Sequence, residues 1–194
     1  MADSLAMGTV DAALDALSAP GYVPFADGYA VPATPGLYAV HAGASTWSTL
    51  GLGEPPDDRP LYVGKAERSL AGRDLGTHFA TGRTGQSTLR RSLAGLLATD
   101  LDLRAQPRST TSPGHFANYG IEAGGDQRLT SWMLAQLRLA TWAAPPETDL
   151  AVVERAVLGR WQPPLNLSSV TTPWRSRIRA ARRVLAQQAR EWQP

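Results

Sequence analysis

The sequence predicts one α/β domain in which a small sheet, mixed or antiparallel, is flanked by helices, with further helices at both ends of the chain. Three observations favour this class. The 194 residues suffice for a single domain with its own core. Short runs of strand-forming residues, at 36–41 and 61–63, stand apart from longer segments with helical spacing of apolar residues. The hydrophobic fraction of 43% is ordinary for a globular protein.

The first part of the chain predicts one helix and two strands. Apolar residues recur at helical spacing over 4–17, and a loop rich in Pro and Gly follows. A strand is predicted at 36–41, and a long connection separates it from a second strand at 61–63, which Gly64 is expected to end. Two short strands joined in this way most simply pair antiparallel, which would bring Tyr38 close to the second strand and to Tyr62 there.

Caps and apolar spacing predict the remaining elements. The predicted helices cover 70–80, a segment capped by Ser87, a short segment capped by Thr130, a segment that ends near 161 and is capped by Thr148 or Asp149, and 173–192. The predicted strands cover 101–107 and 137–142. Residues 108–128 are expected to be irregular. The chain would then divide into an N-terminal helix and loop over 1–34, a main domain over 35–168 and a C-terminal helix over 169–194 that packs on it.

The composition excludes several classes of protein. The chain has no cysteine, so disulfides and thiolate metal sites are excluded. The first residues include Asp3 and no sustained apolar run, which argues against a signal peptide. No apolar stretch is long enough to span a bilayer, so the expectation is a cytoplasmic protein without a membrane partner.

The basic residues are unusual in kind. The net charge is only +2. Lys65 is the only lysine, and apart from the histidines every other basic residue is an arginine. A genome rich in G and C explains the general preference for arginine codons. A lone lysine directly after a Tyr-Val-Gly turn is nevertheless a candidate for a specific role.

The arginines gather towards the C-terminus. After residue 172 there are six arginines and one acid. On an ideal helix over 173–192, one side is an apolar stripe. Beside this stripe lies an arc in which all charged residues are positive: Arg175, Arg179, Arg182, Arg183 and Arg190. A solvated face normally mixes both signs, so this arc favours a surface that binds phosphates. Arg90 and Arg91 lie off the apolar face of the helix capped by Ser87, where they would be either solvated or in contact with phosphate.

Glu154 falls on the apolar face of the helix predicted over 149–161, between Leu150 and Leu158. A carboxylate on a packed face is costly unless it has a partner. The partner would be either an arginine, in a buried salt bridge, or a metal ion at the floor of a cleft. Periodicity alone leaves both alternatives open.

Two triplets in order, Gly36-Leu37-Tyr38 and Tyr62-Val63-Gly64, are followed by an arginine on a helix and by a late glutamate. A Pro-containing turn and an asparagine then follow that glutamate. This combination, over about 35–168, resembles the GIY-YIG nuclease family. The resemblance implies a GIY-YIG-type fold and an active site made of Tyr38, Tyr62, Lys65, Arg73, Glu154 and Asn166. Within this set Asn166 is expected to stabilise the helix turn or to orient a ligand in preference to taking part in the chemistry. The resemblance also implies that Glu154 binds one divalent cation, Mg²⁺ or Mn²⁺. His78 lies five residues after Arg73, not one helical turn, so it is either a partner of the base or a half-buried helix histidine.

The function that the resemblance implies is a Mg²⁺-dependent endonuclease, with DNA as a substrate in preference to RNA. Arg73 would stabilise the phosphate, and a tyrosine, Tyr38 first, would orient or deprotonate the water. A free tyrosine has a pKa near 10, and Lys65 would favour its phenolate. The alternative is an inactive nucleic-acid-binding or interaction module on the same fold. Convergence of the six side chains would discriminate between the two, and the presence of all six favours the enzyme. One hydrolytic centre cuts one strand, so double-strand cutting would need a homodimer or two encounters.

Overall fold

The protein is described here from a computed structural model that covers residues 2–18, 31–73, 77–109 and 114–193, without the side chains of residues 2–6 and of Arg73. Its α-helices are α1 (Ala2–Ser18), α2 (Ala44–Thr49), α3 (Leu70–Arg73), α4 (Thr88–Leu96), α5 (Ala123–Gln136), α6 (Leu150–Trp161) and α7 (Arg175–Glu191). Its strands are β1 (Gly36–Ala42), β2 (Tyr62–Ala66), β3 (Ala105–Gln106), β4 (Gly120–Ile121) and β5 (Leu137–Ala143). The 3₁₀-helices η2 (Thr84–Gln86) and η3 (Phe116–Asn118) complete the described elements.

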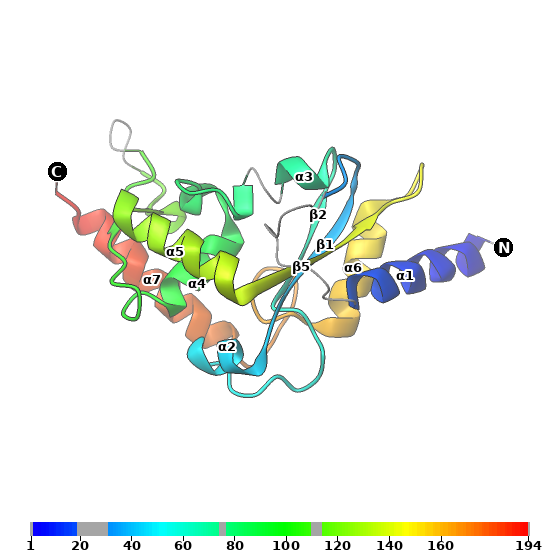
Figure 1. Cartoon of the computed structure of the whole chain (residues 1–194), viewed down its shortest axis with the longest axis horizontal. Coiled ribbons are helices and arrows are strands. Elements are labelled where there is room, and N and C mark those ends of the chain that lie inside the picture. Colours follow the sequence, from blue (N-terminus) through cyan, green and yellow to red (C-terminus); the bar gives the residue numbers. More distant parts are fainter. Residues whose placement is uncertain (1, 19–30, 74–76, 110–113, 194) are drawn as a thin grey trace.

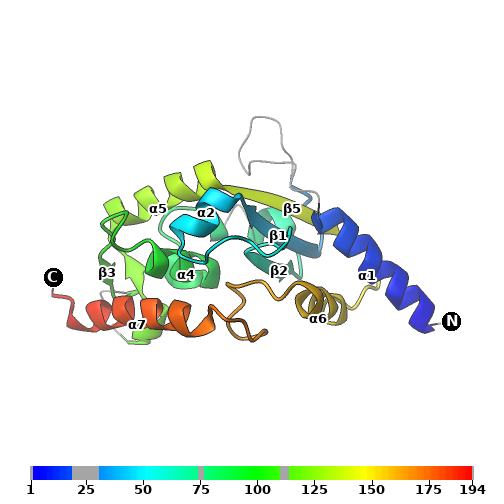
Figure 2. The same ribbon diagram turned by 90° about the horizontal axis from the view of Figure 1, so that it is seen from below.

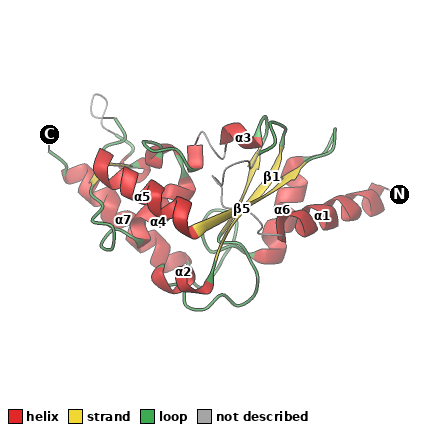
Figure 3. Ribbon diagram, in the orientation of Figure 1, coloured by secondary structure: helices red, strands yellow, loops and turns green. Residues whose placement is uncertain are grey.

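The central sheet has three antiparallel strands in the order β2-β1-β5. Figure 3 shows its strands between two groups of helices. Tyr38 in the middle strand is paired with Gly64 on one side and Thr141 on the other. A separate two-stranded sheet joins β3 to β4. The predicted class, a small sheet flanked by helices, is confirmed.

The two faces of the central sheet are covered by different helices (Figure 1). Side chains alternate between faces along a strand. Leu37 and Ala39 therefore pack into a cluster with residues of α1 and α6, whereas Tyr38 and Val40 belong to a larger cluster with residues of α4, α5 and α7. Both clusters are apolar over most of their surface, so burial on each side of the sheet supplies the main stabilisation.

Several sequence predictions for the elements are confirmed. The structure contains helices over the predicted 4–17, 149–161 and 173–192 segments, with Asp149 as the cap of α6. Ser87 caps α4 by accepting a hydrogen bond from the backbone N–H of Arg90. The strand predicted at 137–142 is β5, and Tyr38 lies beside Tyr62, with ring centroids 6.1 Å apart.

Other predictions for the elements are wrong. Gly64 lies inside β2, which runs on to Ala66, so Lys65 is a strand residue. A long helix, α5, begins at Ala123 within the region expected to be irregular, and Thr130 lies in its middle. Only Ala105–Gln106 of the strand predicted over 101–107 forms. In each case tertiary contacts outweigh weak local propensity.

No helix among the described residues is long and apolar enough to cross a bilayer.

Candidate active site

A pocket of about 570 Å³ lies around β2 and the start of α3. It is lined by Tyr38, Tyr62, Lys65 and Glu154, four of the residues for which the resemblance implies a catalytic or metal-binding role. The remainder of the lining comes mainly from the segment between β2 and α3. Side chains from β1, β2 and α6 therefore meet at one site although they are far apart in the sequence.

The pleat of the sheet explains how this pocket receives side chains from two sides. Tyr38 and Tyr62 belong to the core cluster on one face of the sheet. Lys65 pairs with Leu37, whose side chain faces α1 and α6, so Lys65 is on the face that α6 covers. Because β2 is at the edge of the three-stranded sheet, the pocket can extend around it and reach Glu154 on α6.

Gly64 gives Tyr38 the space that it occupies. A β-carbon at Gly64 would overlap the hydroxyl and the ring of Tyr38, which lies directly across the strand pair. The same holds at the start of β1, where a β-carbon on Gly36 would overlap the backbone carbonyl of Trp142 on β5. The glycines of the two triplets thus have a steric role: they permit close pairing and place a tyrosine over the strand.

His78 lies directly against the hydroxyl of Tyr38. Its Nε2 is 2.6 Å from Tyr38 Oη, and its Nδ1 is 2.7 Å from Ser87 Oγ. The imidazole is fully buried, and its ring also lies edge-on to Tyr62, with centroids 5.9 Å apart. A chain of polar contacts therefore leads from the pocket through Tyr38 and His78 to the cap of α4.

The helix predicted over 70–80 is wrong in extent. As an α-helix, α3 is described only for Leu70–Arg73, Thr77 and His78 form a π-helical turn, and Phe79 and Ala80 lie in a bend. His78 is in a π-helical conformation, so the spacing of an ideal α-helix does not describe the direction of its side chain. The side chain of Arg73 lies outside the described residues, so its predicted contact with phosphate stays a prediction.

Two carboxylates and one ammonium meet at the edge of the pocket. Lys65 Nζ forms an ion pair with Glu67 Oε1 at 3.1 Å. Burial raises the pKa of the Glu154 carboxyl, nearby Lys65 opposes the rise, and Glu67 adds to it. Among the described residues Glu154 has neither an ion pair nor a hydrogen bond. The alternative of a buried salt bridge between Glu154 and an arginine is therefore not found among these residues.

Asn166 has a structural role in this arrangement, and a part in catalysis stays a prediction. It is 7% exposed, its Oδ1 accepts a hydrogen bond from Val63 N at 2.9 Å, and its Nδ2 donates one to Val63 O at 2.7 Å. Leu165 N donates to Leu61 O in the same way. The segment after α6 thus pairs with the outer edge of β2 as a further strand would, and holds Tyr62 in place.

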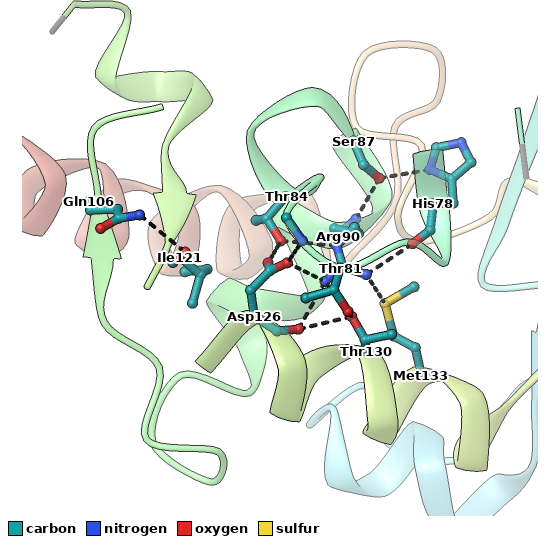
Figure 4. Close-up of polar contacts among 11 residues, drawn as sticks. His78, Thr81, Thr84, Ser87, Arg90, Gln106, Ile121, Asp126, Thr130 and Met133 are labelled. Atoms are coloured by element: carbon teal, nitrogen blue, oxygen red, sulfur yellow. Dashed lines mark hydrogen bonds and ion pairs between the residues drawn. The ribbon is translucent and has the colours of Figure 1, made fainter. Parts of the chain in front are cut away.

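Arg90 is buried inside the domain, so its predicted contact with nucleic acid is wrong (Figure 4). Its guanidinium forms an ion pair with Asp126 at 3.1 Å and donates to Thr84, Thr130 and the backbone carbonyl of His78. Asp126 in turn accepts hydrogen bonds from Gly82 N and Thr84 Oγ1. A buried charge requires such partners, and this network fixes the backbone of His78.

Arg91 is also buried, which corrects the second prediction of a surface contact. It is 8% exposed, and its two terminal nitrogens donate to Gly85 O at 2.8 Å and to Thr88 Oγ1 at 3.3 Å. Burial, then nearby Arg182, lowers the pKa of Arg91 to about 10, so it remains charged at neutral pH. Arg91 therefore lies beneath the surface, where it is not exposed enough for the predicted direct contact with nucleic acid.

The arginines predicted on α7 do not act as one row. Arg179, Arg182 and Arg183 line a common groove, whereas Arg175 is outside it and donates to Thr171 Oγ1 at 3.1 Å. The apolar stripe predicted on the same helix is confirmed where it matters for packing, because Ile178 and Leu185 are fully buried.

Two contributors to the site escape the sequence. Ser87 is recognisable as a helix cap, but its contact with His78 depends on a turn that local patterns do not predict. Asp126 lies in a segment expected to be irregular, and its pairing with Arg90 spans 36 positions. The sequence pattern that pointed to this region was the helix cap at Ser87, which correctly predicted the start of α4.

The match to a known family covers a large part of this geometry. The family model described as "GIY-YIG catalytic domain" matches residues 54–185, well over half of the chain. No curated protein and no solved structure matches the chain. The match begins after β1, so the pairing of β1 with β2 is what adds Tyr38 to the matched segment. By this match the chain belongs to the GIY-YIG catalytic domain family, which consists of endonucleases.

Proposed function

We propose that the protein is a divalent-metal-dependent endonuclease that hydrolyses phosphodiester bonds of nucleic acid, DNA in preference to RNA. The observation that carries the proposal is the meeting of Tyr38, Tyr62, Lys65 and Glu154 at one pocket, with His78 against the Tyr38 hydroxyl. This arrangement supports an active enzyme over an inactive module on the same fold, because packing alone does not require these groups at one opening. The preference for DNA rests on the family resemblance.

The residues at the pocket fit a hard divalent cation. Glu154 offers a carboxylate without a protein partner among the described residues, and burial disfavours its charge until a cation compensates it. The described residues contain no group of three or more His, Cys, Asp or Glu that could hold a metal ion. Mg²⁺ commonly uses one or two carboxylates together with phosphate oxygens and water, so one carboxylate suffices when substrate is bound. When bound, the cation supplies positive charge that stabilises the developing negative charge on the phosphate.

Tyr38 is the first candidate for the group that activates water. Its hydroxyl is at hydrogen-bonding distance from His78 Nε2, to which it can transfer its proton, and the resulting phenolate can accept a proton from water. The Ser87 hydroxyl can either donate to Nδ1 or accept from it, so the buried imidazole has a partner in both protonation states. Arg90 donates to the His78 carbonyl and to Ser87, through guanidinium and backbone N–H respectively, and so positions both.

Lys65 can favour both the phenolate and the bound phosphate. Its ammonium lies at the pocket, where Glu67 holds it in an exposed ion pair that contributes little stability and is easily exchanged. A phosphate entering the pocket can therefore replace Glu67 as its partner. Tyr62 lines the same pocket and can orient the phosphate or the water.

Incubation with several substrates tests the proposal. Plasmid, linear duplex, branched DNA and RNA are each incubated with Mg²⁺, with Mn²⁺ or with EDTA. We expect cleavage of DNA in the presence of either metal, none in EDTA, and loss of cleavage in a Tyr38→Phe variant prepared in the same way. Absence of cleavage of every substrate, by a folded protein that still binds DNA, would identify the inactive binding module instead.

A further inference from the structure

A second pocket, of about 500 Å³, opens between α7, the start of α4 and the segment after α6. Arg179, Arg182 and Arg183 line it, together with the hydroxyl residues Thr88 and Ser168. We call this pocket the arginine groove. It lies outside the catalytic pocket and shares no lining residue with it.

The arginine groove carries positive charge that no acid of the described residues neutralises. None of its three arginines forms an ion pair with a carboxylate in the part of the chain that the structure describes. Arg182 is half-buried, and burial lowers its pKa; nearby Tyr119 opposes this change and nearby Arg179 adds to it. Arg91 adds a further charge beneath Thr88, and its Nε is buried without a hydrogen-bond partner. Such a cluster is costly by itself and is stabilised by a bound anion.

Close packing of α7 on α4 creates this cluster. A β-carbon at Gly95 of α4 would lie 3.1 Å from the backbone of Ala181 and Arg182, closer than ordinary contact. Gly95 therefore lets α7 approach α4, and the buried Ile178 and Leu185 hold it there. The close approach places Arg182 near Arg91, although two like charges repel each other. The fold thus maintains an electrostatically unfavourable arrangement.

The shape of the groove indicates more than a bare anion. Leu167 and Ala186 contribute an apolar wall beside the arginines and hydroxyls. Pockets that hold small organic ligands have volumes of roughly 300–1,000 Å³, a range that includes this one. A phosphate with a sugar or a base attached would use both the charged and the apolar parts of the groove.

The segment after α6 lies between the groove and the catalytic pocket and contributes lining residues on the way from one to the other. Ser168 lines the groove, and its neighbour Ser169 lines a further pocket of about 450 Å³ together with Glu154 and Arg155. Glu154 also lines the catalytic pocket, so it borders both openings. Figure 2 shows α6, the connecting segment and α7 following one another along one edge of the molecule.

We propose that the arginine groove binds one nucleotide of the nucleic-acid strand whose scissile phosphate lies in the catalytic pocket, with a backbone phosphate held by Arg179, Arg182 and Arg183. This inference rests on the proposed nuclease function and adds to it the path of the strand along α6 and α7. Because its arginines are assigned to a backbone phosphate, which carries no sequence information, we expect its contribution to affinity to be independent of sequence.

Binding without cleavage tests the groove separately from catalysis. The full-length chain with Glu154→Gln is titrated in EDTA against a labelled DNA duplex of about 20 base pairs at several salt concentrations. We expect Arg182→Gln to weaken binding about tenfold and to reduce the slope of log K against log salt by about 1, equally for unrelated sequences. Arg183→Gln, at an exposed position, provides a second variant that leaves the fold intact if Arg182→Gln fails to fold. Arg160→Gln is the matched control, because it removes one exposed positive charge from α6 outside the groove.

Equal effects of the groove variants and the control would overturn the inference, even if the wild-type protein cleaves DNA. Salt-dependent binding through the groove without cleavage of any substrate by the wild-type protein would support the groove as a nucleotide-binding site, but it would overturn the proposed nuclease function and with it the strand path to a scissile phosphate. Inorganic phosphate and a nucleoside monophosphate are added as competitors. If either one displaces the duplex at concentrations near the Kd of the duplex, the groove is a site for a small anion and the strand path is wrong.

Discussion

Tyr38 Oη lies 2.6 Å from Nε2 of His78, a residue 40 positions later in the chain. The contact is buried, and it joins the central strand of the sheet to the turn that precedes α4. The contact also identifies Tyr38 as a partner of His78, which the spacing of His78 from Arg73 in the sequence did not indicate. The first prediction follows from this pair.

Tyr38→Phe removes the hydroxyl and keeps the ring that fills the core. If Tyr38 activates water, we expect the cleavage rate to fall by roughly 10²–10⁴-fold, the usual contribution of a positioned acid or base. Loss of the hydrogen bond with His78 should lower stability by only about 1 kcal/mol. Single-turnover cleavage and thermal melting, measured on the same preparation, check both expectations. A rate within a few-fold of wild type would exclude Tyr38 as the activating group and point to Tyr62.

Lys65→Met removes the only lysine charge and keeps an unbranched side chain. If Lys65 favours the phenolate, we expect the rising alkaline limb of the pH–rate profile to move to higher pH, since phenolate loses a neighbouring positive charge. The profile of cleavage rate against pH, at saturating Mg²⁺, measures this shift. Lys65→Arg is the matched control. It keeps the positive charge, so its alkaline limb should stay close to that of the wild-type protein. An unmoved limb with weaker substrate binding would make Lys65 a phosphate ligand only.

Local patterns in the sequence predicted those parts of the fold that have strong local signals. Strand β1, the cap of α4 by Ser87, the cap of α6 by Asp149 and the apolar stripe of α7 all depend on residues close in sequence. Helix α5 was missed in its first half because its start has two glycines and no side-chain cap. Its position is fixed by long-range contacts such as the one between Asp126 and Arg90.

The candidate site could be predicted as a set of residues but not as an arrangement. The two triplets and the late glutamate identified Tyr38, Tyr62, Lys65 and Glu154, which the structure brings to one pocket. Helical spacing misled for Arg90, because a residue off the apolar face of one helix can be buried by another element. The pairing of Asn166 with the backbone of Val63 could not be predicted, because the two residues are far apart in the sequence and meet only in the folded chain.

Asn166→Ala removes two hydrogen bonds to a buried backbone. Each backbone group of Val63 left without a partner costs about 1–3 kcal/mol, so we expect a loss of about 2–5 kcal/mol in unfolding free energy. Urea denaturation measures this loss. Cleavage per folded molecule, at a temperature where the variant remains folded, should stay within about tenfold of wild type because Asn166 does not line the pocket. Normal stability with strongly reduced cleavage would instead restore the catalytic role that the resemblance implied.

Arg90→Gln leaves Asp126 as a buried carboxylate without its ion pair. Breaking such a pair typically costs about 3–5 kcal/mol, and we expect a loss of that size, measured by urea denaturation. The salt dependence of DNA binding should not change, since Arg90 has no exposed surface. A variant of normal stability with a reduced salt slope would contradict the buried network and support the contact with phosphate predicted from the sequence.

Glu154→Gln tests the metal site, because it keeps the size of the side chain and removes its charge. If Glu154 holds the cation, Mg²⁺ should no longer bind at useful concentrations, and cleavage should fall about a hundredfold or more. Metal-free stability should not fall at neutral pH, because burial makes the carboxylate charge unfavourable. Melting temperature and Mg²⁺-dependent cleavage are measured on one preparation. A protein that melts early but cuts normally would contradict the metal role.

The pH dependence of the wild-type protein provides an independent readout of Glu154. Burial raises the pKa of its carboxyl, so protons compete with Mg²⁺ at a higher pH than at an ordinary glutamate. We therefore expect the apparent affinity for Mg²⁺ to fall as pH decreases through this raised pKa. Without metal, the stability of the fold depends on pH in the opposite direction. The folded state binds the proton of Glu154 more tightly than the unfolded state does. The resulting stabilisation is complete below the unfolded-state pKa and is lost as pH rises through the folded-state pKa. Glu154→Gln should lack this loss, and stability curves of the two proteins that stay parallel over the acidic range would show that the carboxyl is not desolvated.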